Sequence, residues 1–63
     1  MRALALVPAV APLLRDREVS VRRHAAWALG RLGGRAAREQ LDRHRGDADP
    51  EVRSEIDDAL DSC

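Results

Sequence analysis

The side chains with the widest chemical repertoire in this sequence are His24, His44 and Cys63. A thiol beside an imidazole can act as a nucleophile, but Cys63 is the last residue, and nothing in the sequence fixes a fraying end near either histidine. Two histidines are too few for a structural zinc site unless acidic groups join them. We therefore expect no catalytic residue, no metal and no cofactor, and a single cysteine allows no internal disulfide.

A stripe on one side of a predicted helix is the second candidate. Ser20, His24, Trp27 and Arg31 follow one another at helical spacing. Tryptophan with arginine and histidine in this arrangement can anchor a partner peptide or stack on a nucleic-acid base. Alternatively, Trp27 covers the neighbouring repeat of the fold and His24 lies at its edge. Both interpretations stay open at this stage.

Charge is segregated along the chain, although the formal net charge is zero. Residues 1–45 carry ten arginines and four acidic residues, whereas residues 46–63 carry one arginine and seven acidic residues. The two parts could attract each other between copies or within one copy, or they are ordinary solvated helix faces. The basic run makes nucleic-acid binding an alternative function, which the acidic tail opposes; it comprises Arg31, Arg35, Arg38, Arg43 and Arg45.

The elements that carry these side chains are repeated at an offset of 31 residues. Asp16, Val21, Arg22, Ala28 and Leu29 recur as Asp47, Val52, Arg53, Ala59 and Leu60. A period of this size is typical of stacked helix pairs that bury their apolar stripes against one another. We expect an all-α fold, a short α-solenoid fragment of two helical hairpins with about four helices. Residues 1–63 would form one domain, with repeat one over about 3–33 and repeat two over about 34–62.

Local signals predict the helix ends. Asp49 can cap a helix over about residues 50–61, and Glu18 occupies the equivalent capping position before a helix over residues 19–32. A helix with few apolar positions is expected between residues 35 and 45.

The helix over residues 19–32 has the clearest core-facing pattern. Its apolar positions recur at i, i+4, i+7, i+8 and i+11, and are Val21, Ala25, Ala28, Leu29 and Leu32. Ala26 and Gly30 are small enough for another helix to approach closely.

The segment over residues 3–14 contains no polar side chain. Pro12 should bend a helix there or delay its first turn, and an apolar helix must be covered on all sides. The segment is too short for a membrane span, which needs about 20 residues. A secretory signal is the other alternative, but cleavage would destroy the first repeat, so we expect a cytoplasmic protein.

Asp16, Arg22 and the run over residues 25–33 resemble the HEAT-like repeat first described in phycobilisome lyases, and the likeness covers about residues 5–61. That repeat occurs in scaffolds, lyase subunits, hydroxylases and DNA-repair glycosylases alike, so the resemblance is informative about the fold and not about the function. It implies a structural ladder of charged hydrogen bonds formed by Asp16, Arg22, Asp47 and Arg53.

The large apolar residues are concentrated in the first half of the chain, while the last helix is acidic. We expect a polar carboxyl-terminal cap and an open, apolar amino-terminal face, because fewer than three repeats rarely stand alone. The predicted function is a non-catalytic protein-protein interaction module, an accessory subunit or a homodimer, that binds a protein partner or a second copy of itself. An accessory subunit of a lyase-type complex is a further alternative. The predicted contacts are Leu4, Val7, Val10 and Leu14, with His24, Trp27 and Arg31 as a second patch.

Overall fold

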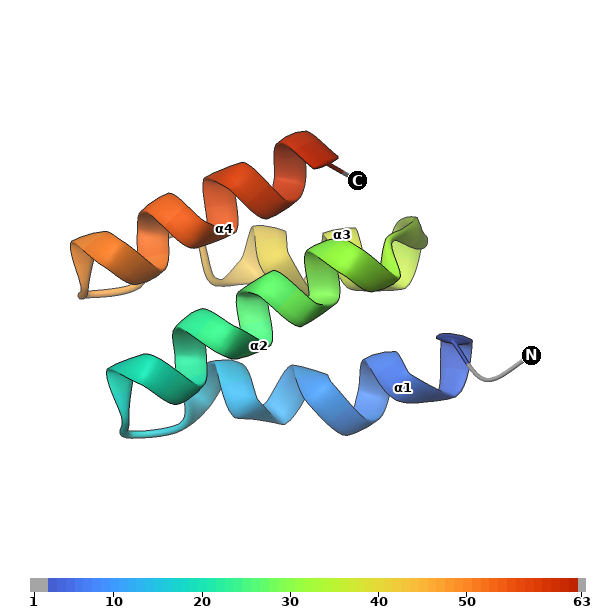
Figure 1. Ribbon diagram of the computed structural model, residues 1–63, viewed down its shortest axis with the longest axis horizontal. Coiled ribbons are helices and arrows are strands. Elements are labelled where there is room, and N and C mark those ends of the chain that lie inside the picture. Colours follow the sequence, from blue (N-terminus) through green and yellow to red (C-terminus); the bar gives the residue numbers. More distant parts are fainter. Residues whose placement is uncertain (1–2, 63) are drawn as a thin grey trace.

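The computed structural model describes residues 3–62, with side chains from residue 6 onward. The described residues form α1 (Ala3–Val10), the 3-10 helix η1 (Ala11–Arg15), α2 (Val19–Leu32), α3 (Gly34–Arg43) and α4 (Pro50–Ser62). The helices α2 and α4 run side by side in one direction, and α1 and α3 run in the opposite direction (Figure 1). This arrangement confirms the all-α prediction of two helical hairpins.

The starts of α2 and α4 differ in their capping. The Asp49 carboxylate accepts the backbone N–H groups of Glu51 at 2.8 Å and Val52 at 3.1 Å, which confirms its predicted capping role. At the start of α2, the side chain of Glu18 forms no such bond, so that part of the prediction is wrong. Instead, Asp16 accepts the N–H of Glu18 at 2.9 Å, because a short aspartate side chain reaches a backbone amide two residues further on.

The first helical segment changes from an α-helix to a 3-10 helix near Pro12. The α-helix ends at Val10 and continues as η1, with Pro12 in the first turn of the 3-10 helix. Proline has no N–H to bond the carbonyl of Pro8, so the α-helical pattern cannot continue through it. The structure shows a change of helix type at Pro12, and the bend stays a prediction.

The two repeats are joined without a loop, because the chain turns at a pair of glycines. Gly33 has φ of 68° and Gly34 has φ of 86°, a region that residues with a Cβ rarely occupy. The third helix begins at Gly34 and ends at Arg43, close to the expected range.

The core spans both repeats and is centred on α2, which contacts α1, η1, α3 and α4. Six of its side chains are inaccessible to solvent: Ala26, Leu29, Ala37, Leu41, Val52 and Ile56. The radius of gyration is 10.2 Å, close to the value of about 11 Å expected for a compact domain of this length. The two hairpins are therefore packed into one folded body.

Candidate interaction surface

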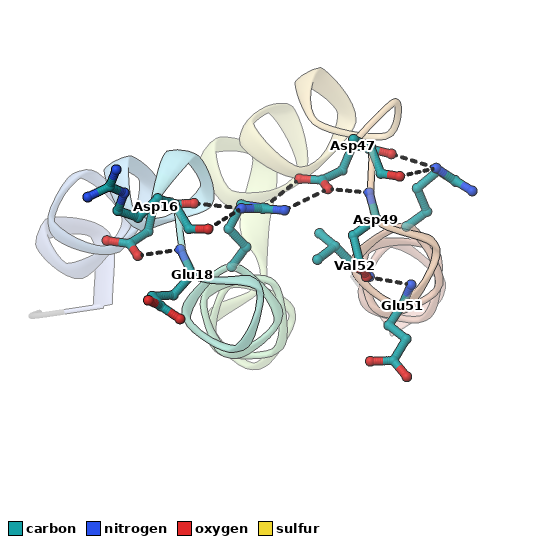
Figure 2. Close-up of polar contacts among 10 residues, drawn as sticks. Asp16, Glu18, Asp47, Asp49, Glu51 and Val52 are labelled. Carbon is teal, nitrogen blue, oxygen red and sulfur yellow. Dashed lines mark hydrogen bonds and ion pairs between the residues drawn. The ribbon is translucent and has the colours of Figure 1, made fainter.

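The two interhelical turns contain equivalent aspartates that hold the backbone in the same way. Asp16 accepts the N–H of Glu18 at 2.9 Å, and Asp47 accepts the N–H of Asp49 at 2.9 Å. Figure 2 shows Asp16 and Asp47 on successive turns of the stack, with the hydrogen bonds that each of them forms drawn as dashed lines.

An arginine in α2 joins the two turns. The Nη1 of Arg22 donates to the carbonyl oxygens of Asp16 at 2.8 Å and Arg17 at 3.2 Å in its own repeat. Its Nε and Nη2 donate to the two carboxylate oxygens of Asp47 at 3.0 and 3.4 Å. The Arg22 and Asp47 side chains are only 16% and 9% exposed, so this bidentate ion pair is largely shielded from water. The structure thus brings Arg22 to the carboxylate of the following repeat, not to that of Asp16.

The equivalent arginine in α4 completes only half of this arrangement. The Nη1 of Arg53 donates to the carbonyls of Asp47 at 2.7 Å and Ala48 at 3.2 Å, as Arg22 does one repeat earlier. Among the described residues, no carboxylate forms an ion pair with Arg53, and no arginine forms one with Asp16. We call an arginine paired with the aspartate of the next turn a rung of the ladder. Arg22 and Asp47 form one complete rung, whereas within residues 3–62 Asp16 lacks an arginine and Arg53 lacks a carboxylate.

An apolar depression lies between η1 and α2, and we call it the amino-terminal groove. Its volume is about 350 Å³, and its lining is almost entirely apolar: Val10, Leu13, Val21, His24, Ala25, Trp27 and Ala28. Leu6 and Leu13 are 46% and 44% exposed on the same part of the chain. On α2, the groove lies on the side opposite Gly30, which packs against Ala59 of α4, and the buried Ala26 lies one turn before Gly30 on that same side.

The predicted anchors of the first segment are only partly available to a partner. Val7 is 4% exposed and Leu14 is 2% exposed, so the prediction that they contact a partner is wrong. Val7 and Leu14 lie on the side of α1 and η1 that packs against α2, because they are spaced seven residues apart and so share one face of the helical segment. Val10 is half-buried and lines the amino-terminal groove. The side chain of Leu4, like the whole of Cys63, lies outside the described part of the chain.

The predicted second patch is brought together on one side of α2. Trp27 is 55% exposed, and the guanidinium of Arg31 lies 5.7 Å from the centre of its ring. The Nδ1 of His24 lies 2.8 Å from the carbonyl oxygen of Ser20. Trp27 lines the amino-terminal groove and also a depression toward α4, which Glu55 and Asp58 make acidic. Trp27 therefore borders the second repeat without being buried by it.

Two arginines of the basic run, Arg38 in α3 and Arg45 just after it, lie beside acidic side chains. Arg45 lies 3.4 Å from a carboxylate oxygen of Asp42 and 3.9 Å from one of Asp57. The adjoining depression, of about 450 Å³, is lined by Arg38, Glu39, Asp42, Arg45, Asp57, Leu60 and Asp61. Carboxylates outnumber guanidinium groups there, which disfavours a phosphate backbone.

His44 occupies the turn between α3 and α4, at the position that Leu13 has in the first repeat. Partial burial lowers the pKa of His44 below its usual 6.5, and the nearby charge of Arg15 lowers it further. Within residues 3–62, no group of three or more histidine, cysteine or acidic side chains is placed to hold a metal ion. No helix in that range is long and apolar enough to cross a membrane.

Two helical hairpins that share one core, with an aspartate–arginine rung between successive turns, define a short α-solenoid. A family model described as HEAT repeats matches residues 1–61, and the chain belongs to this family. HEAT repeats generally mediate protein-protein interaction. Neither the curated proteins nor the solved structures contain a significant match to this chain.

Proposed function

We propose that this chain is a non-catalytic protein-interaction module that binds a protein partner through the amino-terminal groove and the leucines around it. The observation that carries the proposal is the clustering of accessible apolar surface at one end of the stack. Leu13 lines the groove and is 44% exposed, and Leu6 is 46% exposed. Single exposed leucines are ordinary, but Leu13 lies in an apolar groove, and Leu6 lies one helical turn before the groove residue Val10, so a partner can cover both.

The energetics favour burial over charge as the source of affinity. Fully covering a leucine side chain contributes about 1.5–3 kcal/mol, and covering a half-exposed one contributes about half of that. A solvent-exposed ion pair contributes only about 0–1 kcal/mol. Burial of Leu6, Leu13 and the groove therefore supplies the affinity, and charged groups set the orientation.

The partner can be a second copy of the chain or a larger protein that this chain serves as an accessory subunit. The cytoplasm remains our proposal for the compartment. The phycobilisome-lyase type of HEAT-like repeat also remains a proposal, supported by Asp16, Arg22 and the run over residues 25–33. The nucleic-acid alternative is weakened by the ion pairs of Arg45 with Asp42 and Asp57.

Site-specific photocrosslinking in living cells tests this function. A photoreactive amino acid at position 13 should give a discrete adduct, whereas the same group at position 61, on exposed and acidic α4, should give none. An adduct of twice the chain's mass identifies a homodimer, and any other mass identifies an accessory role. Absence of an adduct at position 13, or equal yields at both positions, would contradict the proposal.

A further inference from the structure

We propose that Asp16 is the recognition residue of the amino-terminal groove. Its carboxylate receives the guanidinium of an arginine on a partner helix, and that helix lies in the groove as α2 lies against α4. The inference rests on the proposed function and specifies the chemistry of the partner.

The 31-residue repeat shows what the groove is built to hold. Four residues that line the groove on α2 correspond to four on α4: Val21, His24, Ala25 and Ala28 correspond to Val52, Glu55, Ile56 and Ala59. Three of these α4 residues are buried, and Ala59 packs directly against Gly30 of α2. The amino-terminal groove is therefore equivalent to the surface of α4 that α2 covers, and within residues 3–62 no helix covers the groove in that way.

The side of α2 that faces α4 defines the helix that fits such a surface. Ala26 is completely buried, and a Cβ added to Gly30 would lie 2.8 Å from the Cβ of Ala59. Only small side chains are therefore accommodated at these two positions. One turn before Ala26, Arg22 reaches across to the carboxylate of the next turn. The fitting helix carries an arginine followed at i+4 and i+8 by alanine or glycine.

Asp16 has a carboxylate without an ion-pair partner among the described residues, which this arginine would supply. Its equivalent, Asp47, holds both the N–H of Asp49 and the guanidinium of Arg22. Asp16 holds the N–H of Glu18, and within residues 3–62 no basic side chain forms an ion pair with it. The same aspartate geometry is thus prepared for a guanidinium that a partner would supply.

The outer side of α4 does not carry the pattern of an arginine followed by two small residues, which argues against a second copy as the occupant. The positions equivalent to Arg22, Ala26 and Gly30 are taken by Arg53, Asp57 and Asp61. Stacking a second copy would press two carboxylates against Val21 and Ala28, and burial of unpaired charge is strongly unfavourable. Of a second copy and a different protein, the proposal therefore commits to a helix of a different protein that carries the arginine and small-residue pattern.

The probe for this proposal is a stapled, fluorescein-labelled helical peptide with the sequence of residues 19–32. The staple lies away from the stripe of Arg22, Ala26 and Gly30. Fluorescence anisotropy should show saturable binding to the full chain, and the protein variant Asp16→Asn should bind about tenfold more weakly. Asparagine can still accept the N–H of Glu18, so the turn is kept. The variant Asp61→Asn, which removes an exposed carboxylate from α4, is the matched control and should bind as the parent does.

A double-mutant cycle then assigns the contact. The peptide variant Arg22→Ala should lose the same factor of about ten, with no further loss when it is combined with Asp16→Asn in the protein. Losses that simply multiply would overturn the pairing. Equal binding of the parent and Asp16→Asn proteins would overturn the role of Asp16 and leave the groove as a docking site.

A further variant separates failure of this inference from failure of the proposed function. Leu13→Glu places a charge in the groove and should abolish peptide binding, with the helical circular dichroism unchanged. If the peptide binds Leu13→Glu as tightly as the parent, both the inference and the proposed docking face are wrong. If no peptide binds but the chain sediments as a dimer that Leu13→Glu dissociates, the occupant is a second copy and only the inference fails.

Discussion

The two ends of the stack are built from equivalent helices yet present opposite surfaces. On α2, Ala26 and Gly30 let α4 approach, whereas the equivalent Asp57 and Asp61 on α4 face solvent. At the other end, Val21 and Ala28 of α2 line an open apolar groove, whereas the equivalent Val52 and Ala59 of α4 are buried. Within the described residues, the helix that carries two carboxylates at these positions exposes them to solvent, whereas its counterpart one repeat earlier packs against α4.

Truncation of equivalent leucines should give the largest difference between the repeats. Leu29 is completely buried at the centre of the core, and its equivalent Leu60 is partly exposed. Leu29→Ala should lower the free energy of unfolding by about 2–5 kcal/mol, because it leaves a cavity. Leu60→Ala should cost clearly less. Urea denaturation followed by circular dichroism measures both, and equal losses would show that the core is not centred on α2.

Alanine substitution of the two equivalent aspartates should lower the free energy of unfolding by different amounts, because in the described part of the chain only Asp47 is paired with an arginine. Asp47→Ala leaves the shielded guanidinium of Arg22 without its carboxylate and should cost about 2–3 kcal/mol. Asp16→Ala loses only the turn bond to Glu18 and should cost about 0.5–1.5 kcal/mol in the isolated chain. Thermal unfolding of both variants provides the measurement. A larger loss for Asp16 would mean that the rung joins different residues from those described.

Substitution by alanine at two equivalent positions should distinguish the packing surface of α2 from the exposed surface of α4. Alanine is normally the better residue inside a helix by about 1 kcal/mol. At Gly30, however, its Cβ would meet Ala59 at 2.8 Å, and we expect Gly30→Ala to destabilise by about 1–3 kcal/mol. At the equivalent position, Asp61→Ala should change stability by less than about 0.5 kcal/mol. Stabilisation by Gly30→Ala in chemical denaturation would rule out the close α2–α4 approach.

The smallest expected effect concerns His44. Because burial and Arg15 lower its pKa in the folded chain, protonation favours the unfolded chain. The stability that neutral His44 provides is present above pH 6.5 and is lost as the pH falls through the lowered pKa of the folded chain. Replacement of His44 by leucine, the residue at the equivalent position 13, should flatten the decline in unfolding free energy between pH 7 and pH 5. An unchanged slope would assign the decline to other groups.

The sequence was sufficient to predict the features that depend on local signals. Asp49 before Pro50 predicted the start of α4, and the apolar period of residues 19–32 predicted α2. Ala26 and Gly30 were also identified as points of close approach. Each of these inferences needs only one helix and its ends.

The features that depend on how the repeats stack were beyond a reading of one repeat. The spacing of Val7 and Leu14 marked an apolar stripe but did not show that the chain's own α2 covers it. Leu6 and Leu13, on the other side of the same segment, turned out to be the exposed pair. The bond from Arg22 to Asp47 depends on the offset between two hairpins, which no single motif encodes.

The most direct test of the account is a map of chemical-shift changes in the ¹⁵N-labelled full chain as the stapled helix of residues 19–32 is added. If the amino-terminal groove is the docking surface, the largest changes will fall on Leu13, Val21 and Ala28, while Asp57 and Asp61 will remain unaffected. Changes centred on the outer side of α4, with the groove signals unmoved, would contradict the account.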